Sequence, residues 1–357
     1  MLLKRHDERL LLSPVDLKPL RDDFEVAGVF NPGAILAGRE VVLLVRVAER
    51  PCERRAGFMG LPRWDTKAGL TIDWVPEEEL DTIDPRVVKR KADGLLRLTF
   101  LSHLRVVRCG AGRSVEKVTE EAFLPACELE EFGVEDPRIT AIDGRFYFTY
   151  VAVSRHGAAT ALASTTDFRH FERHGVIFCP ENKDVVLFAE RIDGHYVALH
   201  RPNAATPFCR PEMWVARSLD LIHWGQHECL HGGATGWEAG RVGAGAPPVR
   251  ADEGWIEIYH GNRQPTKPGE VGMYSTGVML LDPKNPARIL KRTASSIFEP
   301  TAEFERRGFV PDVVFPTGIV EMGDSYLIYY GAADCCTAVV EFKRDEVLAA
   351  LSGAVTE

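Results

Sequence analysis

The chain has 357 residues, of which 45% are hydrophobic and 27% are charged. This balance is typical of a globular protein with a sizeable core, and it excludes a disordered chain. The 43 basic and 52 acidic residues leave a formal net charge of −9, which argues against a general nucleic-acid partner or an anionic membrane surface. A bound anion would need a local cluster of cations.

The amino-terminal residues 1–9 carry charges where a secretion signal needs an uninterrupted apolar stretch, and no later apolar run has membrane-spanning length. We therefore expect a cytoplasmic protein with no membrane partner. Its eight cysteines are too few for a disulfide scaffold in so long a chain. Reduced thiols are therefore expected. Because CxxC and HExxH motifs are missing, no metal site is expected.

From Asn31 onward the sequence repeats one pattern: a start marked by polar residues, Pro or Gly, a short apolar run, a Gly-containing turn, and an alternating strand. The predicted strands cover residues 41–46, 95–100, 146–150, 196–201, 255–260 and 326–330. Residues 162–171 and 215–224 add a strand closed by an acidic turn and an aromatic residue, which is a hairpin signal. Six units are recognisable, about 50 residues apart, and the terminal ones could merge.

Short strands at this spacing predict an all-β repeat architecture, and a β-propeller is the simplest solution. A β-sandwich is the alternative, although sandwiches do not usually carry self-similar units of about 50 residues. Helix is expected only in short peripheral pieces, the best at residues 344–351. No Ser-rich or Gly-rich linker divides the chain, so residues 1–357 are read as a single domain whose terminal segments close the ring.

In a propeller the innermost strands converge on a central channel, so polar residues at the starts of repeats should meet in space. These residues are Asn31, Asp84, Asp136, Lys183, Arg241 and Asp312.

Asp136 is the leading candidate for an acid. Pro137 should bias it toward an extended backbone, and burial beside a second carboxyl, Glu135, should raise its pKa. The alternative is a turn-capping Asp, which is common before Pro. Asp84 stands in the same Asp-Pro-Arg triplet, so the triplet alone is weak evidence.

A set of cationic side chains follows later in the chain, each beside a predicted strand or turn: Lys183, Arg201, Arg241 and His260. Brought together, they would form an oxyanion pocket in which Arg supplies a planar fork suited to phosphate. The alternative is that each pairs with a local carboxylate, such as Asp184 or Glu238, on a solvated surface.

Several blocks in this order resemble glycoside hydrolase family 130, the mannoside phosphorylases and related mannosidases on a five-bladed β-propeller. The blocks are 30–33, 135–140, 182–188, 200–202, 243–248, 259–261, 314–316 and 329–334, together with the Arg46 strand. The resemblance implies an inverting phosphorolysis of β-mannosides that yields α-mannose 1-phosphate. It also implies an oligosaccharide and inorganic phosphate as small-molecule partners, with no other cofactor; a homo-oligomer is possible.

The same resemblance implies the residue roles. Asp136 would be the general acid, acting through the mannosyl 3-hydroxyl, which relays a proton to the glycosidic oxygen. The implied phosphate ligands are Asn31, Lys183, Arg201, Arg241 and His260, and the implied sugar-side residues are Arg46, Glu135 and Asp334. Phosphate then takes the place that an activating carboxylate holds in an inverting hydrolase.

Departures from the better-known branch favour β-1,2-linked over β-1,4-linked mannosides. Lys183 and Arg241 exchange residue types, Glu135 replaces an aromatic residue, Pro32 replaces a small hydroxyl residue, and an extra unit surrounds Asp84. Two alternatives stay open: a β-1,2-mannosidase in which Glu212 or Glu238 holds water, and a non-catalytic glycan-binding propeller.

Overall fold

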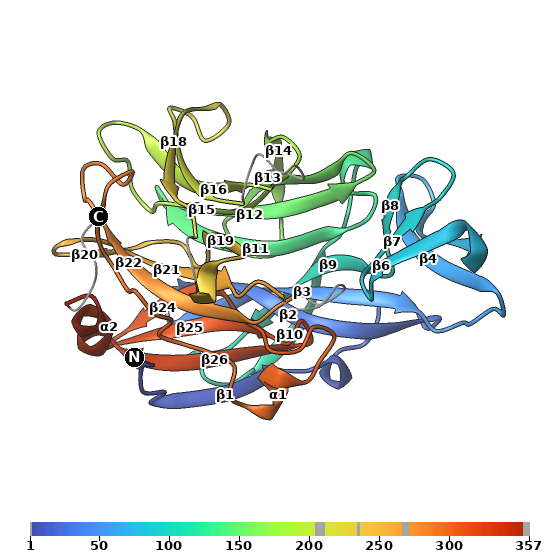
Figure 1. Ribbon diagram of the computed structural model, residues 1–357, viewed down its shortest axis with the longest axis horizontal. Coiled ribbons are helices and arrows are strands. Elements are labelled where there is room, and N and C mark those ends of the chain that lie inside the picture. The colour runs from blue at the N-terminus through green and yellow to red at the C-terminus, as the bar shows by residue number, and fades with distance from the viewer. Residues whose placement is uncertain (1, 204–210, 234–235, 266–270, 353–357) are drawn as a thin grey trace.

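The computed structural model describes residues 2–203, 211–233, 236–265 and 271–352. Within these ranges the chain is almost entirely β-structure, with two short α-helices, α1 (Glu303–Arg306) and α2 (Arg344–Ala350), and four 3-10 turns (Figure 1). The 3-10 turns are Pro14–Asp16, Glu77–Glu79, Glu128–Glu130 and Gly236–Glu238. The predictions of an all-β chain and of a helix near residue 344 are confirmed.

The described residues form five larger antiparallel sheets, in each of which four strands are hydrogen-bonded side by side. We number these sheets in chain order. Sheet 1 contains β2 (Phe24–Ala37), β3 (Glu40–Pro51), β9 (Leu101–Arg108) and β10 (Lys117–Phe123). Sheet 2 contains β11 (Val134–Ile142), β12 (Arg145–Ser154), β13 (Gly157–Thr165) and β14 (Glu172–Phe178). Sheet 3 contains β15 (Asn182–Leu187), β16 (Tyr196–Pro202), β17 (Met213–Ser218) and β18 (Trp224–His231).

Sheet 4 contains β19 (Arg241–Ala244), β21 (Gly254–Asn262), β22 (Tyr274–Leu281) and β23 (Ile289–Arg292), and β20 (Val249–Ala251) also pairs with β21. Sheet 5 contains β24 (Val314–Met322), β25 (Ser325–Ala332) and β26 (Cys336–Lys343), and its fourth strand is β1 (Asp7–Leu12). Because β1 pairs antiparallel with β26, strands from near the two ends of the chain lie in one sheet.

In the inner strands of the sheets, alternating side chains are buried against two different neighbouring sheets. In β3, Val41, Leu43 and Val45 pack in one cluster with sheet 5, whereas Val42 and Leu44 pack in another with sheet 2. The period of two along a strand produces this division, and strands buried on both faces need apolar residues at nearly every position. Similar clusters lie between sheets 2 and 3, 3 and 4, and 4 and 5.

The first strands of successive sheets lie beside one another. Strand β2 contacts both β24 and β11, β11 contacts β15, β15 contacts β19, and sheet 4 contacts β24 through β21 and β22. Polar residues on these first strands are therefore brought together although they are far apart in the sequence.

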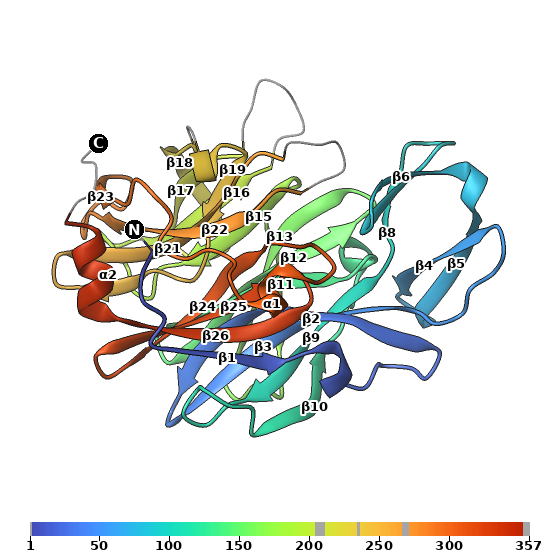
Figure 2. The ribbon, with the colours of Figure 1, turned by 60° about the horizontal axis from the view of Figure 1, so that its bottom comes forward.

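Residues 52–100 do not form a repeat of the same kind, so the interpretation of a unit around Asp84 as a sixth repeat is wrong. They are an inserted segment between β3 and β9, with a hairpin of β4 (Phe58–Asp65) and β5 (Gly69–Pro76) and a three-stranded sheet of β6 (Leu80–Asp84), β7 (Val87–Arg90) and β8 (Leu96–Leu98). This segment projects from one side of the molecule in both views (Figures 1 and 2). Strands β6, β7 and β8 are short, and few residues of the five strands are buried, so the segment does not bury two faces as the repeats do.

Candidate active site

Three polar residues on the first strands share one backbone feature. Asn31, Asp136 and Asp184 have positive φ angles of 51°, 50° and 55°, and each lies where the strand register shifts. Asn and Asp tolerate this left-handed conformation better than other non-glycine residues, and such β-bulges redirect a side chain out of the ladder. The expected extended backbone of Asp136 is therefore wrong, because the bulge overrides the bias that Pro137 imposes.

A cavity of about 210 Å³ lies where these bulges meet. It brings together eight of the nine predicted site residues: Asn31, Arg46, Glu135, Asp136, Lys183, Arg201, Arg241 and Asp334. The ninth, His260, is fully buried behind it, with Nε2 3.3 Å from Asp184 Oδ2. Asp84 and Asp312, expected to converge on the same centre, lie outside this lining.

The acid end of the cavity is a network around Asp136. Asn31 Nδ2 and Arg46 Nη1 donate hydrogen bonds of 2.8 and 2.9 Å to Asp136 Oδ1. Arg46 also donates from Nη2 to Glu135 Oε1 at 2.6 Å and from Nε to Ser102 Oγ at 3.0 Å, and its guanidinium lies over the Phe30 ring. One arginine thus holds both adjacent carboxylates, and Asp136 Oδ2 has no hydrogen bond among the described residues.

The pKa of Asp136 is lowered, which corrects the sequence expectation. Burial alone would raise it, but the charges of Arg46 and Arg138 and the hydrogen bond from Asn31 act against burial and prevail. The pKa of Asp334 moves the other way: burial raises it, and the nearby Asp136 and Glu135 add to the rise, against Arg86 and Arg46. The cavity therefore holds two carboxyl groups whose pKa values are shifted in opposite directions.

The cationic end is organised by Asp184, which is 2% exposed. Arg201 Nη2 lies 2.9 Å from Asp184 Oδ2, and Arg138 Nη2 lies 3.2 Å from Asp184 Oδ1. The alternative of local carboxylate pairing is thus partly correct, but the pairing is buried at the cavity and not on a solvated surface. Burial lowers the pKa of His260 despite the nearby Asp184, so its imidazole is neutral at pH 7.

Several N–H donors at this end have no partner within the described chain. Arg201 is 4% exposed, and its Nε and Nη1 atoms are buried without a hydrogen bond there. Lys183 Nζ is 4.0 Å from Glu135 Oε2, and Arg241 forms no ion pair with another described residue. We call Lys183, Arg201 and Arg241 the cation cluster. Buried unpaired guanidinium donors are costly, so a polyanionic ligand would stabilise them.

Sequence reasoning missed Arg86, which the inserted segment contributes to the cavity lining. Its Nη2 and Nη1 atoms lie 3.2 Å from Asp84 Oδ2 and 3.3 Å from Asp334 Oδ2. The Asp-Pro-Arg triplet at residues 84–86 could have indicated Arg86, but the prediction considered only the Asp of this triplet. Arg138 was also missed, and Asp184 was considered only as a local partner on the surface, since their roles depend on which strands become neighbours.

No group of three or more His, Cys, Asp or Glu side chains that could hold a metal ion occurs among the described residues. No helix in the described ranges is long and apolar enough to cross a membrane.

Comparisons with known proteins show that the chain is similar to phosphorylases of mannosides. A family model described as beta-1,4-mannooligosaccharide phosphorylase matches residues 93–352. Beta-1,2-mannobiose phosphorylase of Listeria innocua is 39% identical over 98% of both chains, and its structure in complex with beta-1,2-mannobiose superposes with a TM-score of 0.89, covering 96% of this chain and 97% of that one. A 1,2-beta-oligomannan phosphorylase of a Thermoanaerobacter species is 36% identical over 68% of this chain and 80% of its own.

Proposed function

The chain belongs to glycoside hydrolase family 130, and from this premise we propose that it catalyses the phosphorolysis of β-1,2-linked manno-oligosaccharides. The products are α-D-mannose 1-phosphate and a saccharide shortened by one mannose. The observation that carries this proposal is the single cavity that holds a carboxyl group, Asp136, together with the cation cluster.

In the proposed reaction the mannosyl ring lies between Asp136 and the cation cluster. Asp136 gives its proton to the mannosyl 3-hydroxyl, which passes its own proton to the glycosidic oxygen as the bond from that oxygen to the anomeric carbon breaks. A phosphate oxygen held by the cation cluster attacks the anomeric carbon from the opposite face, so the configuration inverts. His260 supports the phosphate side through Asp184, and Arg46, Glu135 and Asp334 contact the sugar. Asn31, expected as a phosphate ligand, holds the Asp136 carboxylate by its hydrogen bond and lines the same cavity.

A general acid must carry its proton when the substrates are bound, so the proposal requires that substrate binding raise the lowered pKa of Asp136. Phosphate bound at the cation cluster brings negative charge into the same cavity and offsets the charge of Lys183, which lowers the pKa of Asp136, and a bound mannosyl ring displaces water from the cavity. Both effects favour the protonated carboxyl. Asp136 would therefore take up its proton as the ternary complex forms.

The position of the carboxylates favours phosphate over water as the nucleophile. A hydrolase needs a carboxylate free to activate water, and neither Glu212 nor Glu238 lines the cavity. Glu238 is buried elsewhere, accepting hydrogen bonds from Arg292 Nη1 and Tyr259 Oη at 2.9 and 3.1 Å. Asp184 is neutralised by Arg138 and Arg201. The mannosidase alternative has no comparable support.

Two features support the β-1,2 linkage and the architecture that we propose. The Listeria innocua relative, named for β-1,2-mannobiose, matches over 98% of the chain, which includes the inserted segment. The five sheets, with neighbouring first strands and shared clusters between successive sheets, support one five-bladed β-propeller domain over residues 1–357.

The test is to incubate the purified protein with β-1,2-mannobiose with and without phosphate. We expect one α-mannose 1-phosphate per mannobiose consumed, identified by phosphorus and proton NMR, and little consumption without phosphate. Free mannose formed at the same rate in both samples, with no mannose 1-phosphate, would overturn the proposal. β-1,4-Mannobiose is the control for linkage, and we expect it to react much more slowly.

A further inference from the structure

A second cavity of about 380 Å³ adjoins the one that holds Asp136. Arg86, Val271 and Val310 line both, so the two cavities share a wall. We call them the inner cavity and the outer cavity. The outer cavity is larger, and apolar residues such as Pro85, Phe309 and Pro311 form much of its wall, with Gln264 among its polar groups.

Arg86 stands at the boundary between the cavities and is held in place from two sides. Asp84, from its own segment, accepts from the Arg86 backbone N–H at 2.7 Å and lies 3.2 Å from its Nη2 atom. Asp334, across the cavity, lies 3.3 Å from its Nη1 atom. The guanidinium side chain is 28% exposed, so it can still donate to a ligand. Its charge is balanced by the two carboxylates, which suits a neutral ligand.

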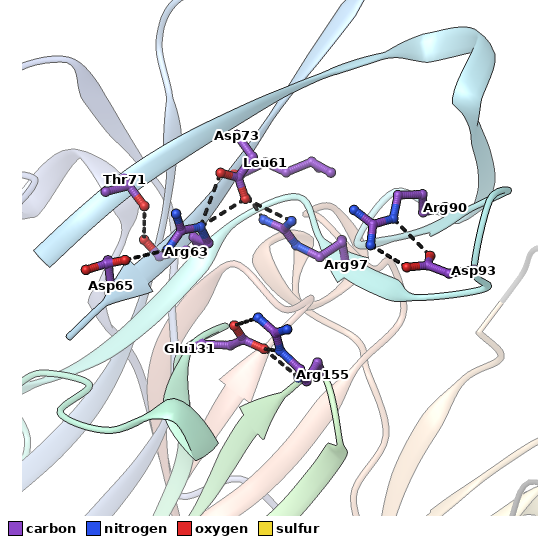
Figure 3. A network of polar contacts seen from close by, with 10 residues as sticks. All are labelled: Leu61, Arg63, Asp65, Thr71, Asp73, Arg90, Asp93, Arg97, Glu131 and Arg155. Atoms are coloured by element: carbon purple, nitrogen blue, oxygen red, sulfur yellow. Dashed lines mark hydrogen bonds and ion pairs between the residues drawn. The ribbon is translucent and has the colours of Figure 1, made fainter. Parts of the chain in front are cut away.

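Polar contacts join the strands of the segment that carries Arg86 (Figure 3), and two further contacts attach this segment to the body of the molecule. Arg97 is 6% exposed and donates to Asp73 Oδ2 at 3.0 Å and to the Leu61 carbonyl at 3.2 Å, and Arg63 also contacts Asp73. The Arg97 guanidinium lies 4.7 Å from the centre of the Phe132 ring, outside the segment. The backbone N–H of Trp64 donates to the backbone carbonyl of Glu131, outside the segment, at 2.7 Å. Arg86 is therefore presented from a fixed platform.

We propose that the outer cavity binds the acceptor side of the substrate, the saccharide that leaves when the mannosyl group is transferred, and that Arg86 is its first specificity-determining contact. This rests on the proposed function. Apolar ring walls and a few hydrogen-bond donors are the chemistry that recognises a neutral sugar, which has apolar faces and hydroxyl edges. The outer cavity has a volume of about 380 Å³ against about 210 Å³ for the inner one, and we expect this room to admit acceptors longer than one sugar.

The first test measures the reverse reaction, synthesis from mannose 1-phosphate and mannose, in wild type, Arg86→Gln, Arg86→Lys and Arg90→Gln. Arg90 is the matched control, since it lies in the same segment and pairs with Asp93 away from both cavities. We expect Arg86→Gln to raise the KM for mannose about tenfold or more, as loss of a charged hydrogen bond does. The KM for mannose 1-phosphate should change little, Arg86→Lys should be intermediate, and Arg90→Gln should match wild type.

Equal rises in both KM values, or no rise for mannose, would overturn the inference. An inactive wild-type protein would instead overturn the proposed function, so the two failures are distinguishable.

A second variant tests the outer cavity independently of Arg86. Gln264→Trp adds bulk at an exposed position of its wall. We expect kcat/KM for β-1,2-mannotriose to fall relative to that for β-1,2-mannobiose, whereas an unchanged ratio would contradict the binding of longer acceptors there.

Discussion

At the scale of single residues, Asp136 and Asp334 show how one cavity sets two carboxyl groups apart. Asp136 is buried and receives hydrogen bonds from Asn31 and Arg46. Asp334 is half-buried, lies 3.3 Å from Arg86 and has two neighbouring carboxylates. The pKa is lowered in the first case and raised in the second. Such a division is typical of sites in which carboxyl groups have different tasks.

The acid role of Asp136 predicts the behaviour of Asp136→Asn. The amide keeps the size of the side chain but cannot supply a proton, so kcat should fall by about 10²–10⁴. Isothermal titration should show β-1,2-mannobiose binding within a few-fold of wild type. Asp143→Asn, at an exposed turn of the same sheet, is the control and should retain activity. Turnover of Asp136→Asn near the wild-type rate would contradict the assignment.

At the scale of elements, the inserted segment depends on a few polar anchors because its core is small. Leu61, Leu80 and Val88 are its buried cluster, and Arg97 connects the hairpin to the body through Asp73 and Phe132. Loss of these contacts should loosen the segment without unfolding the five sheets.

Hydrogen exchange of Arg97→Met tests this. Methionine keeps some packing on Phe132 but removes both hydrogen bonds, so amides of β4, β5 and β8 should exchange faster, while those of β11 and β12 should not change. Arg90→Gln serves as the control variant. Exchange that speeds up equally in the sheets, or not at all, would show that Arg97 does not anchor this segment.

The sequence was informative where a pattern is local and less so where neighbours decide. Short apolar runs at 41–46 and 326–330 identified strands, and glycines at 144 and 194 marked turns, because both signals are local in the sequence. The spacing also suggested a unit at Asp84, but spacing does not reveal whether a strand buries one face or two. The φ of Asp136 could not be predicted, since the bulge depends on the register with β12.

The site residues were also predicted unevenly: individual polar positions were found, but contacts between distant strands were not. Asn31, Lys183, Arg201 and Arg241 were expected to meet, and the structure places them in one cavity. Asp184, which neutralises part of that cluster, was treated only as a local partner, because its contacts with Arg138 and Arg201 join strands distant in sequence.

At the scale of the whole molecule, Asp184 connects three sheets. Its carboxylate on β15 contacts Arg138 of β11, Arg201 of β16 and His260 of β21. Burial would raise its pKa, but Arg201, His260 and Arg138 lower it far below the ordinary value. Removing a buried charge that balances two arginines is strongly destabilising, at about 3–5 kcal/mol.

This lowered pKa gives the pH dependence a definite sign. The stabilisation by Asp184 is present above the unfolded-state pKa of about 3.9 and is lost as the pH falls toward the folded-state value. Urea titrations between pH 3 and 7 should show that Asp184→Asn is less stable at pH 7 and loses less stability on acidification than wild type. The exposed Asp324→Asn is the control. Equal stability of Asp184→Asn and wild type at pH 7 would contradict the role.

The central claim is that an acid and an anion site face each other across one bound mannosyl ring. A crystal structure of Asp136→Asn with β-1,2-mannobiose and phosphate tests it most directly. The account predicts phosphate within hydrogen-bond distance of Lys183, Arg201 and Arg241, with the anomeric carbon between the phosphate and the Asn at position 136. Phosphate bound outside the inner cavity, or a mannosyl ring that does not lie between the two, would contradict it.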